Sequence, residues 1–173
     1  MYDKFINELL KWNKIHKLTN YQTKEEIQKQ IDDSLYPLKE IKNAKTAADI
    51  GTGAGFPGLI LAMAMPETTW YLIEPLKKRY SYLNYIKTLL NLKNVKIIPK
   101  RVEETELPKI DLITSRAVMP TKEIIKIAKP LIKDDTTILL YKGSNVLEEL
   151  DNLKASIITK DKRNYVFLKG KDV

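Results

Sequence analysis

The sequence predicts an α/β fold, in which a short helical extension precedes a mostly parallel sheet with helices packed between its strands. Hydrophobic residues in the first 45 positions recur at helical spacing. From Thr46 onward, short apolar runs alternate with longer helical segments, as in βαβ units. Prolines 66, 99, 120 and 130 stand near the proposed boundaries, where they disturb neither helix interiors nor central strands. We therefore expect one domain over 1–173, with an extension over 1–45 and an α/β core over 46–173.

The extension is expected to contain two helices. The first begins near Tyr2, because apolar side chains at positions 2, 5, 6, 9, 10 and 15 share one helical face. The second begins after Thr23 and runs toward Tyr36, just before Pro37. Thr23 and Glu26 have the spacing of a capping box, which marks the start of a helix.

Seven strands are expected in the core, the last two forming a terminal hairpin. They are residues 46–50, 70–73, 95–98, 111–114, 137–141, 156–159 and 165–168. Helices fit between them at residues 58–65, 76–91, 121–131 and 145–153. The alternation gives the core its parallel βαβ character.

Composition narrows the class of protein. The 173 residues are 43% hydrophobic and 30% charged, enough for a real core. There is no cysteine, which excludes disulfides, thiolate metal sites and a cysteine nucleophile, and His16 is the sole histidine, so we assign no metal. The apolar stretch 59–65 is too short to span a bilayer, and the N-terminus is amphipathic rather than a signal peptide. We expect a monomeric, cytoplasmic protein without membrane contact.

The net charge of +8 is concentrated in one stretch. Residues 74–101 carry eight basic side chains against one acidic side chain, Glu74. A polyanion such as RNA would release counterions on meeting such a patch. Lys77, Lys78 and Arg79 are the candidates for this contact. The alternative is a solvated, lysine-rich surface.

A glycine-rich turn follows the first strand of the core. In AADIGTGAGFPG (47–58), the strand ends at Asp49-Ile50, glycines at 51, 53 and 55 make the turn, and a helix begins near Gly58. Glycine tolerates positive φ and lets a ligand approach the backbone without a Cβ in the way. The turn therefore predicts a binding site for a nucleotide-containing cofactor.

The spacing of the turn separates two cofactor classes. A dinucleotide loop, G-x-G-x-x-G, needs glycine where Phe56 stands, and Gly55 arrives one residue early. The pattern G-x-G-x-G with Asp49 two residues before it is typical of loops that bind S-adenosyl-L-methionine. There Asp49 can meet the charged methionine end directly or through water, whereas it would repel a pyrophosphate. Another nucleotide, or a purely structural turn, is the alternative.

Glu74 ends the second strand of the core, 19 residues after Gly55. A carboxylate at this place can accept hydrogen bonds from both hydroxyls of a ribose. Both cofactor classes use it. Glu74 therefore indicates a nucleoside without saying which one.

Beyond the turn, several motifs occur in the order seen in one family. The sequence resembles the bacterial small-subunit ribosomal RNA methyltransferase G family over nearly its whole length. The matching segments are WNKIHKLTN (12–20), DDSLYPL (32–38), DIGTGAGFPG (49–58), EPLKKRYSYL (74–83), KRVEE (100–104), SRAV (115–118) and YKG (141–143). The glycine turn is shared with many methyltransferases, whereas the other motifs in this order are more specific.

The resemblance implies a Rossmann-like, seven-stranded class I methyltransferase sheet. It also implies methyl transfer from S-adenosyl-L-methionine to N7 of a guanine in the decoding-region loop of 16S ribosomal RNA, on the RNA or the small subunit. Carried over by position, residues of the turn and of the following strands hold the cofactor: Gly51, Gly53 and Phe56 line it, Glu74 takes the ribose, Val102 and Glu103 lie at the adenine, and Arg116 lies at the active-site mouth. Two positions depart from the family pattern, Lys17 in place of asparagine and Gln30 where histidine is frequent, and both bear on the RNA side.

The residues fit this chemistry. Guanine N7 has a lone pair and no proton, so no general base is required. Methylation at C5 of a pyrimidine would need a cysteine, which is absent. Methylation of an exocyclic amine is usually served by an Asn/Asp-Pro-Pro-aromatic motif, whereas residues 115–120 read SRAVMP. Catalysis would then rest on alignment and electrostatics.

Arg116 is the candidate catalytic residue, because it can bind the cofactor carboxylate, guanine O6 or a phosphate. The alternative for Arg116 is a salt bridge to Asp111 or Glu103. Lys17 and Lys142 are weaker RNA candidates, and Lys142 can equally be a solvated lysine. Trp12 and Tyr21 can stack on an unpaired base, although helical spacing favours a core position for Trp12. Two other functions stay open: methylation of a small molecule or protein, and a non-catalytic RNA-binding assembly factor.

Overall fold

The computed structural model describes residues 1–116 and 119–173. Seven strands form one sheet in the order β3-β2-β1-β4-β5-β7-β6. Strands β1 to β5 are parallel to one another, and β7 runs antiparallel to both β5 and β6. The strands are β1 Thr46–Ile50, β2 Thr69–Ile73, β3 Val95–Ile98, β4 Leu112–Arg116, β5 Thr137–Lys142, β6 Ala155–Lys160 and β7 Arg163–Lys169. This arrangement is the Rossmann-like α/β sheet that the sequence predicts.

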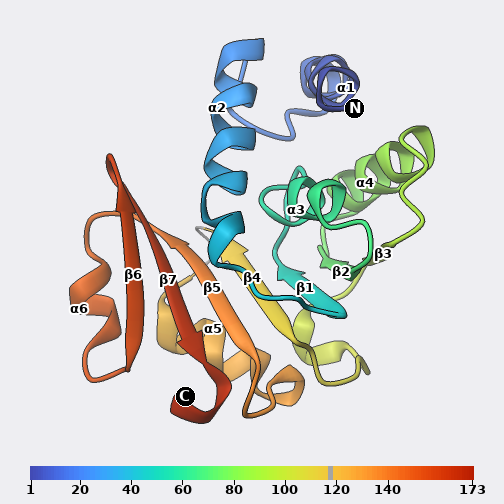
Figure 1. Ribbon diagram of the computed structural model, residues 1–173. Coiled ribbons are helices and arrows are strands. Elements are labelled where there is room, and N and C mark those ends of the chain that lie inside the picture. The colour runs from blue at the N-terminus through green and yellow to red at the C-terminus, as the bar shows by residue number, and fades with distance from the viewer. Residues whose placement is uncertain (117–118) are drawn as a thin grey trace.

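Helices cover both faces of the sheet (Figure 1). They are α1 Tyr2–His16, α2 Lys24–Leu35, α3 Gly58–Ala64, α4 Lys77–Leu89, α5 Thr121–Ala128 and α6 Val146–Leu150. One hydrophobic cluster combines residues of α1, α2, α3 and α4 with residues on one face of the sheet. A second cluster combines residues of α5 and α6 with residues on the other face. Short 3-10 segments lie at Tyr36–Glu40, Val102–Glu104, Lys129–Leu131 and Gly170–Asp172. No helix among the described residues is long and apolar enough to cross a membrane.

The extension shares its core with the sheet. Phe5 and Leu9 of α1 and Ile27 and Ile31 of α2 are fully buried in the cluster that contains Trp70 of β2. The predicted capping box is confirmed, since the side chains of the N-cap threonine and of the N3 glutamate both bond the backbone. Trp12, for which helical spacing favours a core position, is half-buried at the rim of this cluster, with its ring centre 5.5 Å from that of Tyr82.

The boundaries of the predicted elements differ from the structure at a few places. The helix expected over 121–131 ends at Ala128 and continues as a 3-10 turn, because Pro130 cannot donate to a helical ladder. The helix expected over 145–153 covers Val146–Leu150 alone, since Asp151 adopts a positive φ of 51°. The fourth strand extends to Arg116, which places that side chain on the strand end rather than on the following loop.

The strand order positions the functional site. The chain builds the sheet outward from β1 to β3 and then returns to pair β4 with the other side of β1. In open α/β sheets, ligands bind beyond the carboxyl ends of the strands at such a reversal.

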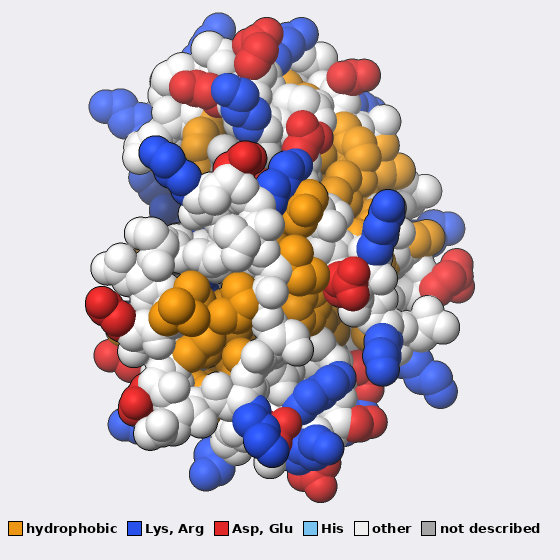
Figure 2. All heavy atoms as spheres, turned by 60° about the vertical axis from the view of Figure 1, so that its left-hand side comes forward, with side chains coloured by type: hydrophobic (Ala, Val, Ile, Leu, Met, Phe, Trp, Pro, Cys, Tyr) orange, Lys and Arg blue, Asp and Glu red, His pale blue; other side chains and the backbone are white. Residues whose placement is uncertain are grey.

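The face that carries β6 and α6 shows basic and acidic side chains interspersed around apolar patches (Figure 2). It therefore does not gather charge of one sign.

Candidate cofactor pocket

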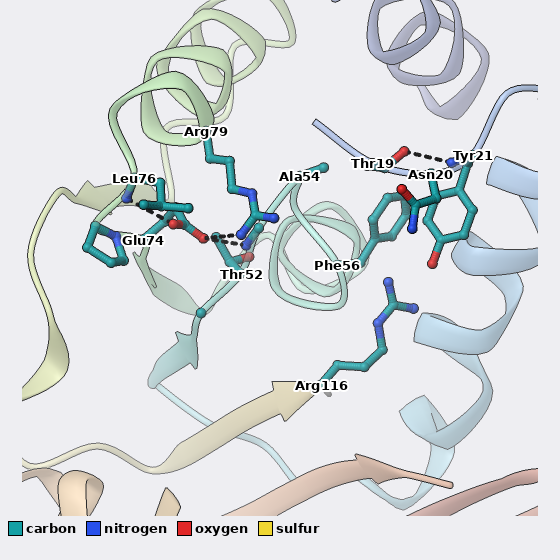
Figure 3. Close-up of a pocket in the computed structure, with 13 residues that line it drawn as sticks. Thr19, Asn20, Tyr21, Thr52, Ala54, Phe56, Glu74, Leu76, Arg79 and Arg116 are labelled. Atoms are coloured by element: carbon teal, nitrogen blue, oxygen red, sulfur yellow. Dashed lines mark hydrogen bonds and ion pairs between the residues drawn. The ribbon is translucent and has the colours of Figure 1, made fainter. Parts of the chain in front are cut away.

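A pocket of about 640 Å³ lies at the carboxyl ends of β1, β2 and β4. Ligand sites commonly span roughly 300–1,000 Å³, so this volume suits a nucleoside cofactor. Backbone of the glycine turn lies between two groups of polar side chains, one near α4 and one near α2 (Figure 3). The lining residues are Thr19, Asn20, Tyr21, Gly51, Thr52, Gly53, Ala54, Phe56, Glu74, Pro75, Leu76, Arg79 and Arg116.

The glycine turn exposes backbone to this pocket. Gly53 has a φ of 60° and Gly55 a φ of 102°, in the left-handed region that L side chains rarely adopt. A Cβ at Gly53 would meet no atom closer than 3.9 Å, so it is the backbone conformation that requires glycine there. A Cβ at Gly55 would lie 2.9 Å from the Cβ of Leu59, so close packing on α3 is a second reason at that position. Gly51, Gly53 and Phe56, which the sequence assigns to the cofactor, line the pocket.

Glu74 is held at the end of β2 by two backbone groups. Its Oε2 accepts from the N–H of Gly53 at 2.9 Å, and its Oε1 accepts from the N–H of Leu76 at 3.0 Å. Arg79 Nη1 lies 3.8 Å from Oε2. A carboxylate has about four acceptor positions, so each oxygen can accept a further hydrogen bond. Although its side chain is 2% exposed, Glu74 therefore still offers acceptors to the pocket.

Arg79 lies inside the pocket, beside Glu74 (Figure 3). The sequence predicts that Arg79, together with Lys77 and Lys78, contacts RNA. Its Nε is buried and has no hydrogen-bond partner among the described residues. A buried, unpaired N–H is costly unless a ligand satisfies it. This observation fits a polar group of a bound cofactor at the same place.

Asp49 corrects one prediction about the site. Its side chain is fully buried, and its oxygens accept from the Gly58 N–H at 2.9 Å and the Thr114 hydroxyl at 2.6 Å. Burial raises the pKa of Asp49 to about 6, although these two donors oppose the shift. Asp49 lies on the same face of β1 as Ala47, which packs in the cluster that includes α3. The prediction that Asp49 meets the cofactor is therefore wrong, because the carboxylate ties β1 to β4 and α3 instead.

Gly58 explains the end of the FPG motif. A Cβ built at this glycine would collide with the side chain of Asp49. Its N–H therefore reaches the carboxylate because no side chain stands between them. The peptide bond before Pro57, which precedes Gly58, is cis.

Arg116 extends from the end of β4 into the pocket. Its Nη1 donates to Gln30 Oε1 at 3.1 Å and to Asp33 Oδ2 at 3.2 Å, both on α2. The guanidinium carbon lies 5.1 Å from the centre of the Phe56 ring, within range of a cation–π contact. Arg116 forms its ion pair with Asp33, and not with Asp111 or Glu103, the partners considered as the alternative. Asp111 precedes β4 at its opposite end.

A loop that sequence reasoning left unassigned closes the pocket on the α2 side. Asn13, 5% exposed, donates to the Tyr21 carbonyl at 2.8 Å and accepts from the Thr19 N–H at 2.8 Å. This bridge holds the backbone of 19–21, and Tyr21 packs edge-on against Phe56 with ring centres 6.2 Å apart. The signal that could have found it is the WNKIHKLTN motif (12–20), which contains Asn13 and the first two residues of the loop.

Several predicted site residues lie elsewhere. Val102 is buried in the cluster on the other face and Glu103 is exposed, and neither lines the pocket. Lys142 is 8% exposed, and its amine donates to Glu149 at 2.6 Å and to the Met119 carbonyl at 2.9 Å. The alternative of a solvated lysine is wrong for Lys142, because a partly buried ion pair, with side chains 10% and 33% exposed, occupies its amine, while its contact with phosphate stays a prediction.

The other basic candidates surround the pocket. Lys17 follows α1, and Lys77 and Lys78 begin α4, with all three side chains exposed. Lys78 Nζ donates to the carbonyl of His16 at 3.1 Å, which joins the start of α4 to the end of α1. The last two positions of the SRAV motif, 117 and 118, lie outside the described residues. Among those described, no group of three or more acidic or histidine side chains could hold a metal ion.

The parallel sheet, the glycine turn after β1 and the carboxylate at the end of β2 define a methyltransferase of the S-adenosylmethionine-dependent class. A family described as rRNA small subunit methyltransferase G matches residues 1–172. The chain belongs to this family.

Named relatives agree with this assignment. The chain is 48% identical over 169 residues to ribosomal RNA small subunit methyltransferase G of Campylobacter curvus, covering 97% of this chain and 89% of that protein. It is 47% identical over 169 residues to the protein of the same name from Wolinella succinogenes, covering 97% and 88%. A crystal structure of a SAM-dependent methyltransferase from Aquifex aeolicus shares the fold, with a TM-score of 0.66, 19% identity and coverage of 83% of this chain and 96% of that one.

Proposed function

We propose that the protein transfers a methyl group from S-adenosyl-L-methionine to N7 of a guanine in the decoding-region loop of 16S ribosomal RNA. The observation that carries this proposal is the pocket between Glu74 and Arg116, in a chain of the rRNA methyltransferase G family. We further propose that it acts as a monomer in the cytoplasm, on ribosomal RNA or the small ribosomal subunit.

The residues near α4 fit the nucleoside part of the cofactor. Glu74 offers free acceptor positions for ribose hydroxyls, and the turn at Gly51 and Gly53 lets a ligand lie on the backbone. Arg79 lines the same pocket, and its Nε–H has no hydrogen-bond partner among the described residues. Val102 and Glu103 follow β3, whose Ile98 carbonyl accepts from the Glu74 N–H at 3.0 Å. We keep as a proposal that Val102 and Glu103 lie at the adenine, although neither lines the pocket.

The chemistry asks little of the protein beyond orientation. When bound, S-adenosylmethionine supplies a methyl group on a positively charged sulfur. Guanine N7 has no proton to remove, so the chain needs no general base. Phe56 and Tyr21 offer aromatic surface to a base, and Arg116 offers donors to an anionic or carbonyl oxygen. Positioning of this kind can supply roughly 7–11 kcal/mol of barrier reduction.

The exposed lysines around the pocket fit a phosphate backbone. Lys17 directly follows α1 and Lys77 and Lys78 begin α4, and the contact between Lys78 and His16 joins these two helix ends. Contacts of this type fix orientation and add affinity without reading sequence. They suit a large polyanionic acceptor better than a free metabolite.

Methyl transfer to small ribosomal subunits tests the proposal. Subunits from a strain that lacks this gene would receive labelled methyl from S-adenosylmethionine, and the modified base would be mapped. We expect one labelled guanine, modified at N7, in the decoding-region loop. Label on another RNA position, on protein or on free metabolites would contradict the proposal. Cofactor binding by calorimetry without any transfer would favour a non-catalytic assembly factor.

A further inference from the structure

Asp33 of α2 lies at the centre of a polar cluster that joins three separate parts of the chain. Its Oδ2 accepts from Nη1 of Arg116 at 3.2 Å. Its Oδ1 accepts from Nε of Arg163 at 3.0 Å and from the hydroxyl of Tyr165 at 2.9 Å. Both carboxylate oxygens are therefore engaged, and the donors come from the ends of β4 and β7.

The cluster is largely shielded from water. The side chains of Arg116 and Asp33 are 10% and 15% exposed, and that of Arg163 is 30% exposed. Burial and the neighbouring Asp33 raise the pKa of Tyr165 above its ordinary value, so its hydroxyl stays protonated and donates. Removing the carboxylate would leave two guanidinium groups close together and poorly solvated, which is strongly unfavourable. One negative charge and two positive charges leave a net positive charge beside the pocket.

The contacts hold one end of the Arg116 guanidinium. Both hydrogen bonds to α2 start at Nη1, with Gln30 as the second acceptor. Among residues 1–116 and 119–173, Nη2 and Nε of Arg116 have no protein acceptor. They remain for a ligand, and Figure 3 shows the guanidinium directed from β4 toward Phe56 and Tyr21. Stacking on a ring permits in-plane sliding, whereas the two acceptors on α2 fix the in-plane direction.

We infer that Asp33 is a positioning residue for methyl transfer: through its ion pair, the helical extension sets the direction in which Arg116 presents its free N–H groups to the ligand. The inference rests on the proposed function. It assigns the extension a part in the reaction besides packing. Gln30 adds a neutral and therefore weaker bond to the same nitrogen.

Asp33→Asn tests this role, because the amide keeps the size of the side chain but cannot accept from Arg116 and Arg163 together. We expect a loss of up to about 100-fold in kcat/KM for small subunits, because a misplacement of about 1 Å at the reacting groups can cost that much. Asp32→Asn is the matched control. Asp32 is the preceding residue of α2, is exposed and bonds Gln28 at 2.8 Å, so we expect wild-type rates.

A double-mutant cycle separates positioning from a merely structural effect. If Asp33 acts through Arg116, Asp33→Asn should cost nothing further in an Arg116→Ala background. Equal losses in both backgrounds would overturn the inference, as would wild-type rates for Asp33→Asn alone. Urea unfolding of each variant shows that the comparison is made on folded protein.

A second readout does not depend on activity. Nitrogen-15 NMR of arginine side chains reports the order of the Arg116 Nε–H group, assigned with Arg116→Lys. We expect an ordered group in the wild type and in Asp32→Asn, and a mobile one in Asp33→Asn. An unchanged order in Asp33→Asn would refute positioning. A wild type that methylates no subunits would refute the proposed function, while this measurement would still decide the role of Asp33.

Discussion

Asp49 and Arg116 show that the sequence can predict a polar side chain at a strand end without predicting the direction in which that side chain points. The sequence marks both as polar residues at strand ends, where a site is expected. The alternation of faces along β1 turns Asp49 inward under α3, whereas Arg116 reaches the pocket. Spacing from the glycines does not reveal that Thr114 and Gly58 take both oxygens of Asp49. Such partners come from strands and helices that the chain brings together only on folding.

Arg116→Ala should impair turnover more than folding. Removing a donor aimed at a reacting ligand typically costs about 100-fold or more. Asp33 keeps its bonds to Arg163 and Tyr165, so we expect a smaller effect on stability. Steady-state methylation of small subunits and thermal unfolding would measure the two effects. Wild-type rates in the variant would refute a role for Arg116 in the site.

The raised pKa of Asp49 predicts a dependence of stability on pH. In the folded protein its pKa is about 6, against an ordinary value of 3.8. Below about pH 3, roughly one unit under the ordinary pKa, the group is protonated in both states and costs nothing. As the pH rises toward 6, the unfolded state ionises first, so the free energy of unfolding falls. The total loss is about 3 kcal/mol, because one pKa unit corresponds to about 1.4 kcal/mol.

Asp49→Asn should remove this term. The amide oxygen can accept from Gly58, and the Thr114 hydroxyl can turn to accept from the amide nitrogen. Urea unfolding between pH 4 and pH 7.5 should show the wild type losing stability relative to the variant. A difference that stays constant over this range would contradict the buried, raised carboxyl.

At the scale of elements, the sequence predicts which helices and strands exist better than it predicts where they begin and end. Short apolar runs and bounding prolines locate all seven strands, and the Thr23–Glu26 spacing locates α2. The early end of α6 depends on the positive φ of Asp151, which no hydrophobic period encodes. The place of β7 between β5 and β6 was also beyond local pattern, since a hairpin can join a sheet by either strand.

The start of α3 depends on a missing side chain. Gly58→Ala should destabilise the protein by more than about 2 kcal/mol, because the added Cβ would collide with Asp49 in a packed region. Gly143→Ala is the matched control, since a Cβ there meets nothing within 4 Å. Thermal unfolding should show a lowered Tm for the first variant and little change for the second. Equal Tm values would show that α3 can shift to accept the methyl group.

At the scale of the molecule, distant segments build one pocket on one core. Residues of the loop after α1, of the turn after β1, of the segment between β2 and α4, of α4 and of β4 line it together. The two helices of the extension share one hydrophobic cluster with α3, α4 and the sheet, so we propose that 1–173 fold as a single domain. The cofactor half of the site could be predicted from the glycine turn and Glu74. The α2 half could not, because Asp33 acts through Arg116, Arg163 and Tyr165, which are far away in sequence.

Affinity for ribosomal RNA should fall with salt, and the exposed lysines should contribute to the slope. Replacing Lys17, Lys77 or Lys78 by alanine removes one phosphate contact, which lowers the slope of log K against log salt by about 1 each. Lys126 on α5 is the control. It lies beside the residues that precede β5, near the amino ends of the strands, whereas the pocket lies at their carboxyl ends. Slopes identical to that of the wild type would contradict phosphate contacts at these lysines.

The contacts of Asp33 also set a time order during synthesis. Arg163 and Tyr165 follow Asp33 by 130 and 132 positions. At about 5–20 residues per second, a ribosome needs on the order of ten seconds to add that length of chain. For that interval α2 exists without two of the three donors that surround its carboxylate. The protein therefore completes the support of Arg116 only as its last strand emerges, and a chain still being translated lacks it.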